Sequence, residues 1–167
     1  DENESGVDLI LLQDETLLLL GQAQGSKKIY LVKVDSDGNL IWEKYMGGNS
    51  DVPKDIEAVD NGSFIILSDY KKTDDNSDIK LIRIDSDGNS LDSAVYGSPG
   101  NENSNSITPL TDGGFIIAGT TEYTSILPKP SDPNDASDIF HFRCDANLQF
   151  DSITWKSQYG AGTIDEG

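Results

Sequence analysis

Two stretches of the chain that lie fifty residues apart are nearly the same sequence: IYLVKVDSDGN at Ile29–Asn39 and IKLIRIDSDGN at Ile79–Asn89. A related stretch, IFHFRCD at Ile139–Asp145, comes sixty residues after the second. These stretches are rich in the β-branched residues that favour strands, and the first two end in Asp-Gly-Asn, which favours a tight hairpin turn. Self-similarity at about fifty residues indicates a repeat architecture.

Two further elements recur in the same order. The first is an apolar element that reads LLLLG at Leu17–Gly21, FIILS at Phe64–Ser68 and FIIAG at Phe115–Gly119. The second is the end of the repeat, which carries Met46-Gly47, Tyr96-Gly97 or Tyr159-Gly160. The order therefore predicts three tandem repeats, each of four short strands joined by turns. No stretch has sustained helical periodicity, so the expected fold class is all-β.

Four-stranded units at this spacing are typical of β-propeller blades. We therefore expect a β-propeller built of four-stranded antiparallel blades, with three blades in this chain. The expected segments are an acidic N-terminal tether, the three blades in order, and a proline-rich loop inserted in the third blade: residues 1–6, 7–54, 55–106, 107–167 and 123–138.

One segment connects the repeat to a known family. DSDGNLIW at Asp35–Trp42 resembles the D-x-x-G-x-x-x-W segment of quinoprotein-like propeller repeats, whose tryptophan docks between blades. The longer unit, with DGGFIIAG at Asp112–Gly119, resembles the repeats of exported propeller lipoproteins of the Bacteroides group. The chain departs from this pattern at the tryptophan, which is Asp92 in the second repeat and is displaced to Trp155 in the third. The resemblance implies a propeller fold and carries little about function.

Three blades leave the ring open, because propellers close with about four to eight. We expect either a homodimer that closes a six-bladed ring or the missing blades of a longer chain. The acidic opening Asp1–Gly6 resembles the tether that follows the lipidated cysteine of a mature bacterial lipoprotein. We therefore expect an exported protein in the periplasm or on the outer cell surface, held by a lipid anchor.

Composition excludes several partners. The 167 residues include 30 Asp and Glu against 12 Lys and Arg, for a formal net charge of −18. Such a surface repels nucleic acid and anionic lipid. One cysteine excludes a disulfide framework within the chain, and no apolar run approaches the ~18 residues of a membrane span.

The rim loops are the predicted binding region, because long loops on a rigid scaffold are where binding is most often built. Two tyrosines could stack on a sugar face, and several acids lie in the same loops: Tyr70, Tyr123, Asp74, Asp75, Asp132 and Asp135. The alternative is a solvated acidic rim that only keeps the protein soluble.

Other reactive side chains have structural interpretations. His141 has no second ligand at metal spacing and is expected to be a half-buried strand residue, and Cys144 is expected in the core. A cation recurs in one column, two residues before an Asp, which predicts ion pairs or, alternatively, a ring of cations for an anionic ligand: Lys33, Arg83 and Arg143 with Asp35, Asp85 and Asp145.

The DSDGN turns resemble the opening of a calcium loop. The weak calcium candidates are Asp35, Asp37, Asp85 and Asp87. The twelfth-position Glu of an EF-hand is missing, and the third turn, Ala146-Asn147-Leu148, lacks the acid and the glycine. A plain hairpin turn is favoured, and no other cofactor is expected.

No residue pattern distinguishes a catalytic pair from surface charge, so no catalytic residue is expected. The predicted function is a non-catalytic binding or scaffolding propeller that recognises a glycan or a protein through its rim loops. The alternatives are a fragment or subunit of a glycan-active propeller enzyme, whose missing blades carry the catalytic groups, and a calcium-stabilised structural assembly.

Overall fold

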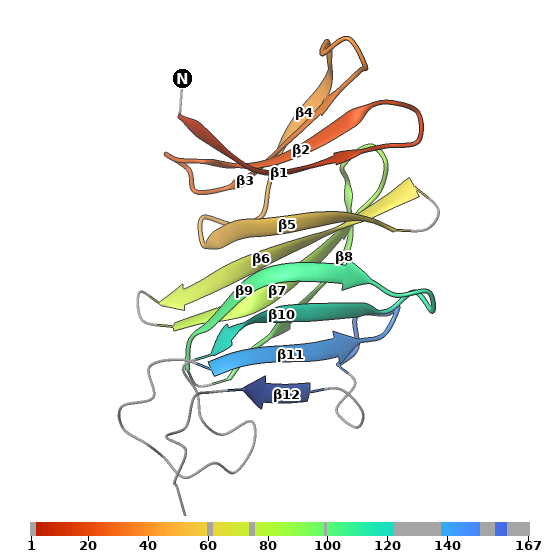
Figure 1. Cartoon of the computed structure of the whole chain (residues 1–167). Helices are drawn as coiled ribbons and strands as arrows, with labels where there is room; N and C mark the ends of the chain where they lie inside the picture. Colours follow the sequence, from red (N-terminus) through yellow and green to blue (C-terminus); the bar gives the residue numbers. More distant parts are fainter. Residues whose placement is uncertain are drawn as a thin grey trace, which may run out of the picture.

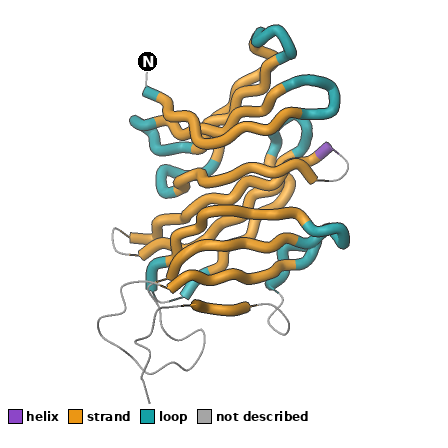
Figure 2. Tube along the Cα trace, viewed as in Figure 1, coloured by secondary structure: helices purple, strands orange, loops and turns teal. Residues whose placement is uncertain are grey.

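The computed structural model describes residues 3–59, 62–73, 76–98, 100–121, 138–150 and 156–159. Within these residues the regular structure is β-strand, apart from the single helical residue Gly62 (Figure 2). The prediction of an all-β fold is confirmed. None of the described residues belongs to a helix that is long and apolar enough to cross a bilayer.

The described strands form three four-stranded sheets, one from each sequence repeat. The first sheet contains β1 (Glu4–Leu11), β2 (Leu17–Ala23), β3 (Ile29–Val34) and β4 (Leu40–Met46). The middle sheet contains β5 (Asp51–Val59), β6 (Ser63–Thr73), β7 (Asn76–Ile84) and β8 (Ser90–Tyr96). The third sheet contains β9 (Glu102–Pro109), β10 (Phe115–Thr121), β11 (Asp138–Cys144) and β12 (Lys156–Tyr159). Neighbouring strands are antiparallel and follow one another in the chain.

The first strand of each sheet starts earlier than the sequence indicated. β1 pairs with β2 from Glu4 onward, so residues 4–6, expected in a tether, belong to the sheet. β5 and β9 start at Asp51 and Glu102, ahead of the expected boundaries at residues 55 and 107. These strands open with polar side chains, which hid them from a search for apolar strands. The proline-rich segment falls almost entirely outside the described residues.

The three sheets are stacked, with the middle sheet between the other two (Figure 1). The first strands β1, β5 and β9 lie next to one another along one side of the stack. The sheets are thus arranged like blades, and they do not close into a ring in the part of the chain that the structure describes.

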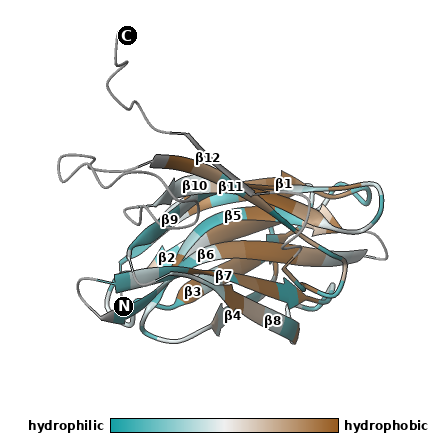
Figure 3. Ribbon diagram, turned by 90° about the horizontal axis from the view of Figure 1, so that it is seen from below, coloured by the Kyte–Doolittle hydropathy of each residue, from teal (hydrophilic) through white to brown (hydrophobic). Residues whose placement is uncertain are grey.

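The middle sheet is buried on both faces because successive strand residues point to opposite sides. On β6, Phe64 and Ile66 pack against the first sheet, whereas Ile65 and Leu67 pack against the third. Burial on both faces explains why FIIL at Phe64–Leu67 is an unbroken apolar run. In Figure 3 most of the hydrophobic colour lies on the strands. Fully burying each such side chain stabilises the fold by about 1.5–3 kcal/mol.

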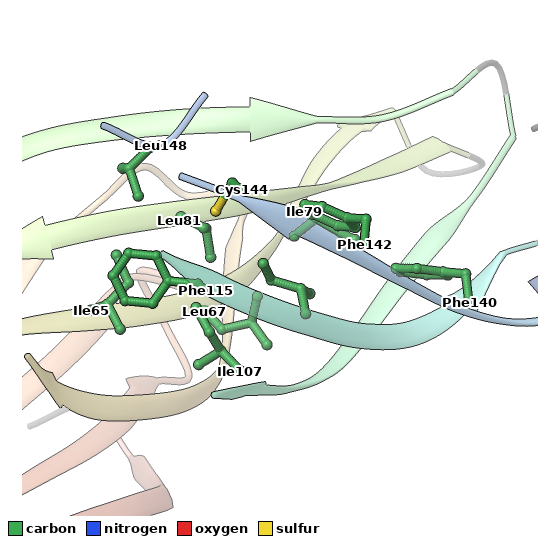
Figure 4. Packing of buried hydrophobic residues seen from close by; sticks show 11 residues of the cluster. Ile65, Leu67, Ile79, Leu81, Ile107, Phe115, Phe140, Phe142, Cys144 and Leu148 are labelled. Atoms are coloured by element: carbon green, nitrogen blue, oxygen red, sulfur yellow. The ribbon is translucent and has the colours of Figure 1, made fainter. Parts of the chain in front are cut away.

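The interface between the first and middle sheets is mainly aliphatic and consists of Leu18, Leu20, Ile29, Leu31, Ile56, Phe64, Ile66, Ile82 and Ile84. The interface between the middle and third sheets is richer in aromatic side chains, and Figure 4 shows its members: Ile65, Leu67, Ile79, Leu81, Ile107, Phe115, Ile117, Phe140, Phe142, Cys144 and Leu148.

Trp42 packs between the first and middle sheets, at the edge of their shared core. Its ring lies over Gly88, where an added Cβ would be only 2.8 Å from Trp42 Cη2. In the middle sheet the equivalent residue is Asp92, which pairs with Arg83 at 3.7 Å instead of entering the next interface. Tryptophan packing between sheets is therefore seen in the first of the two interfaces.

Two carboxylates link the first strands of neighbouring sheets. The Ile56 N–H donates to Asp8 Oδ2 at 3.2 Å, and the Ile107 N–H donates to Asp55 Oδ2 at 2.9 Å. Each of these Asp residues follows an irregularity in its strand, which turns the side chain toward the next sheet. The same hydrogen bond thus fixes the register of both interfaces.

Candidate ligand-binding site

The rim where β2 joins β3, β4 joins β5 and β6 joins β7 is the region that the sequence predicts for binding. Of the predicted residues there, Tyr70 lies among the described ones, on β6, and is half-buried. The Lys80 ammonium lies 5.4 Å from the centre of the Tyr70 ring. The other five predicted residues lie outside the described part of the chain: Asp74, Asp75, Tyr123, Asp132 and Asp135.

A cleft of about 630 Å³ opens at this rim between the first and middle sheets. Its described lining comes from the β2–β3 connection, the β4–β5 connection and the end of β6, and it comprises Gln22, Gln24, Lys27, Asn49, Ser50, Val52, Lys71 and Lys72. We call it the rim cleft.

The chemistry of the rim cleft differs from that of the chain as a whole. Three of the 12 Lys and Arg residues line it, and none of its described lining residues is acidic, in a chain with a net charge of −18. All three lysines are exposed, and Lys72 also forms an ion pair with the buried Asp78. The other polar lining residues carry amide or hydroxyl groups, so the cleft suits an anionic, hydroxyl-rich ligand.

One hydrogen bond between the two sheets and two within them hold the walls of the cleft. Gln22 Nε2 donates to the Asp51 carbonyl at 3.3 Å, and the Lys71 N–H donates to the Ser50 carbonyl at 2.8 Å. Gln24 Nε2 donates to Ser5 Oγ at 3.0 Å. These bonds join segments that are far apart in the sequence, so the cleft is largely pre-formed.

Buried acids anchor the connections beneath the rim. Asp51 is fully buried, and its carboxylate accepts hydrogen bonds from Gly48 N at 2.7 Å and from Lys80 Nζ at 2.9 and 3.1 Å. Glu102 has the same position in the third repeat and accepts a hydrogen bond from Ser98 N at 2.9 Å. These pairs are fully engaged in fixing the β4–β5 and β8–β9 connections, so we assign them a structural role.

Two glycines leave room for buried carboxylates, those of Asp51 and Asp78. At Gly47 an added Cβ would collide with the Asp51 carboxylate, and at Gly97 it would collide with the carboxylate of Asp78. The recurring Met-Gly and Tyr-Gly endings of the repeats are therefore explained, in these two copies, by carboxylates that occupy the space of a side chain.

The calcium candidates lie in hairpin turns that satisfy their own carboxylates. Asp35 Oδ1 accepts hydrogen bonds from the N–H groups of Asp37 at 3.0 Å and Asn39 at 2.8 Å, and its Oδ2 accepts one from Asn39 Nδ2 at 3.0 Å. The Asn39 amide and these N–H groups lower the pKa of Asp35, and the equivalent bonds from Asn89 lower the pKa of Asp85.

Asp37 and Asp87 are exposed in the same turns. Among the described residues, no three or more His, Cys, Asp or Glu side chains gather in a way that could hold a metal ion. The hydrogen bonds within the turns account for Asp35 and Asp85 without calcium.

The third turn keeps this geometry although it lacks the glycine. The N–H groups of Asn147 and Gln149 donate to Asp145 Oδ1 at 2.9 and 2.7 Å, as in the other two turns. Leu148 takes the glycine position with φ of 57° and is buried. The third turn therefore remains a hairpin turn without the second acid and the glycine of the other two copies.

The predicted ion pairs along the cation column are wrong for the two arginines. Arg83 pairs with Asp92 across the sheet and donates to the Ala146 carbonyl at 2.6 Å, and Arg143 pairs with Asp112. The Asp residue two positions after each arginine binds its own turn instead. Hydrogen bonds within a turn join residues that are close in the sequence, so the carboxylates of Asp85 and Asp145 bind their own turns and not the arginines.

His141 is half-buried on β11, and Cys144 is fully buried in the interface between the middle and third sheets, as predicted. Burial raises the pKa of the Cys144 thiol, so this residue is a poor nucleophile. Both side chains have positions expected of structural residues.

The rim cleft was not predicted as a cationic site, because its lysines come from different repeats and occupy no shared column. No protein-family model matches the chain, and a search of curated proteins finds no match either. Function is therefore inferred from the geometry of the chain.

Proposed function

We propose that the chain is part of a β-propeller that acts as a non-catalytic binding module and takes an acidic glycan in the rim cleft. The single observation that carries the proposal is the cleft itself, which gathers Lys27, Lys71 and Lys72 at the predicted binding rim of a strongly acidic protein. The blade-like stack of three sheets, with β1, β5 and β9 side by side, supports the propeller.

The lining favours a glycan over an apolar protein segment. Val52 is the only aliphatic side chain among the described lining residues, and the others offer amide, hydroxyl and ammonium groups. Ammonium groups bind the carboxylate of a sugar acid, and amides bind hydroxyls. An exported, lipid-anchored protein at the cell surface is the setting that we propose, on the basis of the family resemblance of the repeats.

The proposal is tested by calorimetric titration with polygalacturonate, an acidic polymer, and with dextran, a neutral one. We expect binding of the acidic polymer alone, weakened by salt. The double variant Lys27→Gln and Lys71→Gln should weaken binding at least about tenfold, because two exposed charge partners are lost. Lys28→Gln is the matched control for Lys27→Gln alone, since it removes one charge from the same connection but does not line the cleft.

Equal binding of both polymers, or equal losses in the Lys27→Gln and Lys28→Gln variants, would overturn the proposed site. The same mixtures are assayed for new reducing ends over several hours. Release of reducing ends would favour the alternative, a glycan-active enzyme, whereas saturable binding without release supports a binding module.

A further inference from the structure

The first sheet has an apolar face that the described chain leaves uncovered. β2 alternates, so Leu18 and Leu20 face the middle sheet while Leu17 and Leu19 face the other way. We call this side the outer face of the first sheet, and the strand register places six apolar residues on it: Leu9, Leu11, Leu17, Leu19, Val32 and Val34. Leu9 is 56% exposed and Leu11 is 69% exposed.

The equivalent face is buried in the other two sheets. The pair Leu17–Val34 corresponds to Phe64–Ile84 in the middle sheet and to Phe115–Cys144 in the third, in the same strand register. Those four counterparts are 0–3% exposed, because each lies against the preceding sheet. A sheet face that meets water normally carries polar residues. The apolar outer face of the first sheet is therefore built to be covered by a preceding sheet.

The third sheet offers the matching surface. Its outward residues Ile116, Ala118 and Ile139 occupy the columns of Ile65, Leu67 and Ile79, which in the middle sheet pack against a following sheet. Ile139 is 61% exposed. The chain thus carries both halves of an interface that it already forms twice internally.

Two further details extend this match. In the interface between the middle and third sheets, the Arg83 guanidinium lies 5.9 Å from the centre of the Phe115 ring. The counterpart of Arg83 in the third sheet is Arg143, on its outward side, and the counterpart of Phe115 in the first sheet is Leu17, on its outer face. Leu9, the counterpart of Ile56, donates its N–H to its own Asp8 at 2.8 Å, so this donor sits where a preceding sheet would bind.

We propose that a second copy of the chain covers the outer face of the first sheet with the outward face of its own third sheet, and that two such contacts close a ring of six sheets. The contact is head-to-tail, and in a two-fold pair it is made twice. The uncovered apolar surface is then buried at both junctions. This inference does not depend on the rim ligand.

Light scattering after gel filtration tests the proposal without any ligand. The expected mass is twice 18.1 kDa over a dilution series. Leu9→Lys should raise the dimer dissociation constant at least about tenfold, because its counterparts Ile56 and Ile107 are each 1% exposed in the existing interfaces, and the substitution places a charge in such a dry contact. Leu91→Lys is the matched control, since Leu91 is 57% exposed on β8 and lies on neither outer face. A monomeric wild type, or a dimer equally sensitive to both substitutions, would overturn the proposal.

A mixing experiment tests the head-to-tail geometry. Ile139→Asp on the third sheet should also weaken the dimer, although this residue is on the opposite end of the stack from Leu9. Mixed together, Leu9→Lys and Ile139→Asp chains retain one intact junction, so dimer should reappear in the mixture. A dimer that tolerates Ile139→Asp, or a mixture that stays monomeric, contradicts this geometry. Circular dichroism confirms that each variant is folded.

Discussion

The two interfaces between neighbouring sheets share one backbone plan but distribute bulk in opposite ways. Between the first and middle sheets, the large Trp42 meets a glycine, Gly88, in the β7–β8 turn. Between the middle and third sheets, the tryptophan column holds Asp92 and the glycine column holds Leu148. The tryptophan column supplies the larger residue at the first interface, and the glycine column supplies it at the second. In each of these two interfaces one of the two columns supplies the bulky side chain, so the two columns have to be considered together.

The largest effect is expected from breaking the tryptophan–glycine contact. Gly88→Ala should destabilise the chain by about 3 kcal/mol, of which ~1 kcal/mol comes from the positive φ and the rest from crowding against Trp42. Gly38→Ala is the matched control, because its φ of 83° is similar to the 74° of Gly88 but nothing lies within 4 Å of its added Cβ. Urea denaturation measures both. Equal losses would show that the tryptophan contact has no energetic role.

At the second interface we expect an unusual order of stability among substitutions at Leu148, with glycine tolerated better than alanine. Leu148→Ala should cost about 2–3 kcal/mol, because it empties buried space while keeping a side chain at positive φ. Leu148→Gly loses the same packing but recovers ~1 kcal/mol of backbone strain. The glycine variant should therefore unfold at the higher urea concentration. If alanine proves the better replacement, the positive φ is not a source of strain here.

The carboxylate links between the first strands give a smaller, pH-dependent effect. Burial, with a further contribution from the neighbouring Asp8, raises the pKa of Asp55 above its ordinary 3.8. The folded chain therefore holds its proton to higher pH than the unfolded chain, and ionisation costs stability at neutral pH. Asp55→Asn still accepts the Ile107 N–H, so it should be more stable at neutral pH by roughly 0.5–1 kcal/mol.

This gain should shrink as the pH falls through the raised pKa and should level off below 3.8, where wild-type Asp55 is protonated in both states. Denaturation curves across this range measure the difference. In an Asp8→Asn background the pH-dependent part should be smaller, since one cause of the raised pKa is removed. A difference that stays constant with pH contradicts the assignment.

The smallest effect is expected from calcium. Because both oxygens of Asp35 and of Asp85 accept hydrogen bonds inside their turns, calcium or a chelator should leave the melting temperature unchanged within error. Differential scanning calorimetry measures this. An upward shift with calcium would revive the calcium-stabilised assembly that the DSDGN turns suggested.

The repeat was enough to predict the sheets, because each one forms from strands that are neighbours in the sequence. The turn at Asp85–Asn89 and the burial of Cys144 followed from their columns alone. The starts of β5 and β9 were missed because Asp51 and Glu102 are polar, although both are buried. Asp51 and Glu102 are buried because they bind the connections beside them, and a search for patterns of apolar residues does not detect such buried acids.

The rim cleft illustrates the other limit of the sequence. Lys27 and Lys71 belong to different sheets and to no repeated column, so only the stacking of the sheets brings them together. The prediction pointed to this rim from loop positions and named its acids and tyrosines, whereas the cleft among the described residues is lined by lysines, amides and hydroxyls. Contacts across an interface depend on how two sheets are placed, which one repeat read alone does not specify.

The pairing of each strand with its neighbour in the chain also has a consequence for folding kinetics. Hairpins with short loops form quickly, so the first and middle sheets can assemble from local contacts even though the fold is all-β. The middle sheet, which has two apolar faces, gains its burial only when the others dock. During synthesis the first sheet emerges before it and provides one of these surfaces. We therefore expect the chain to fold vectorially, one repeat at a time.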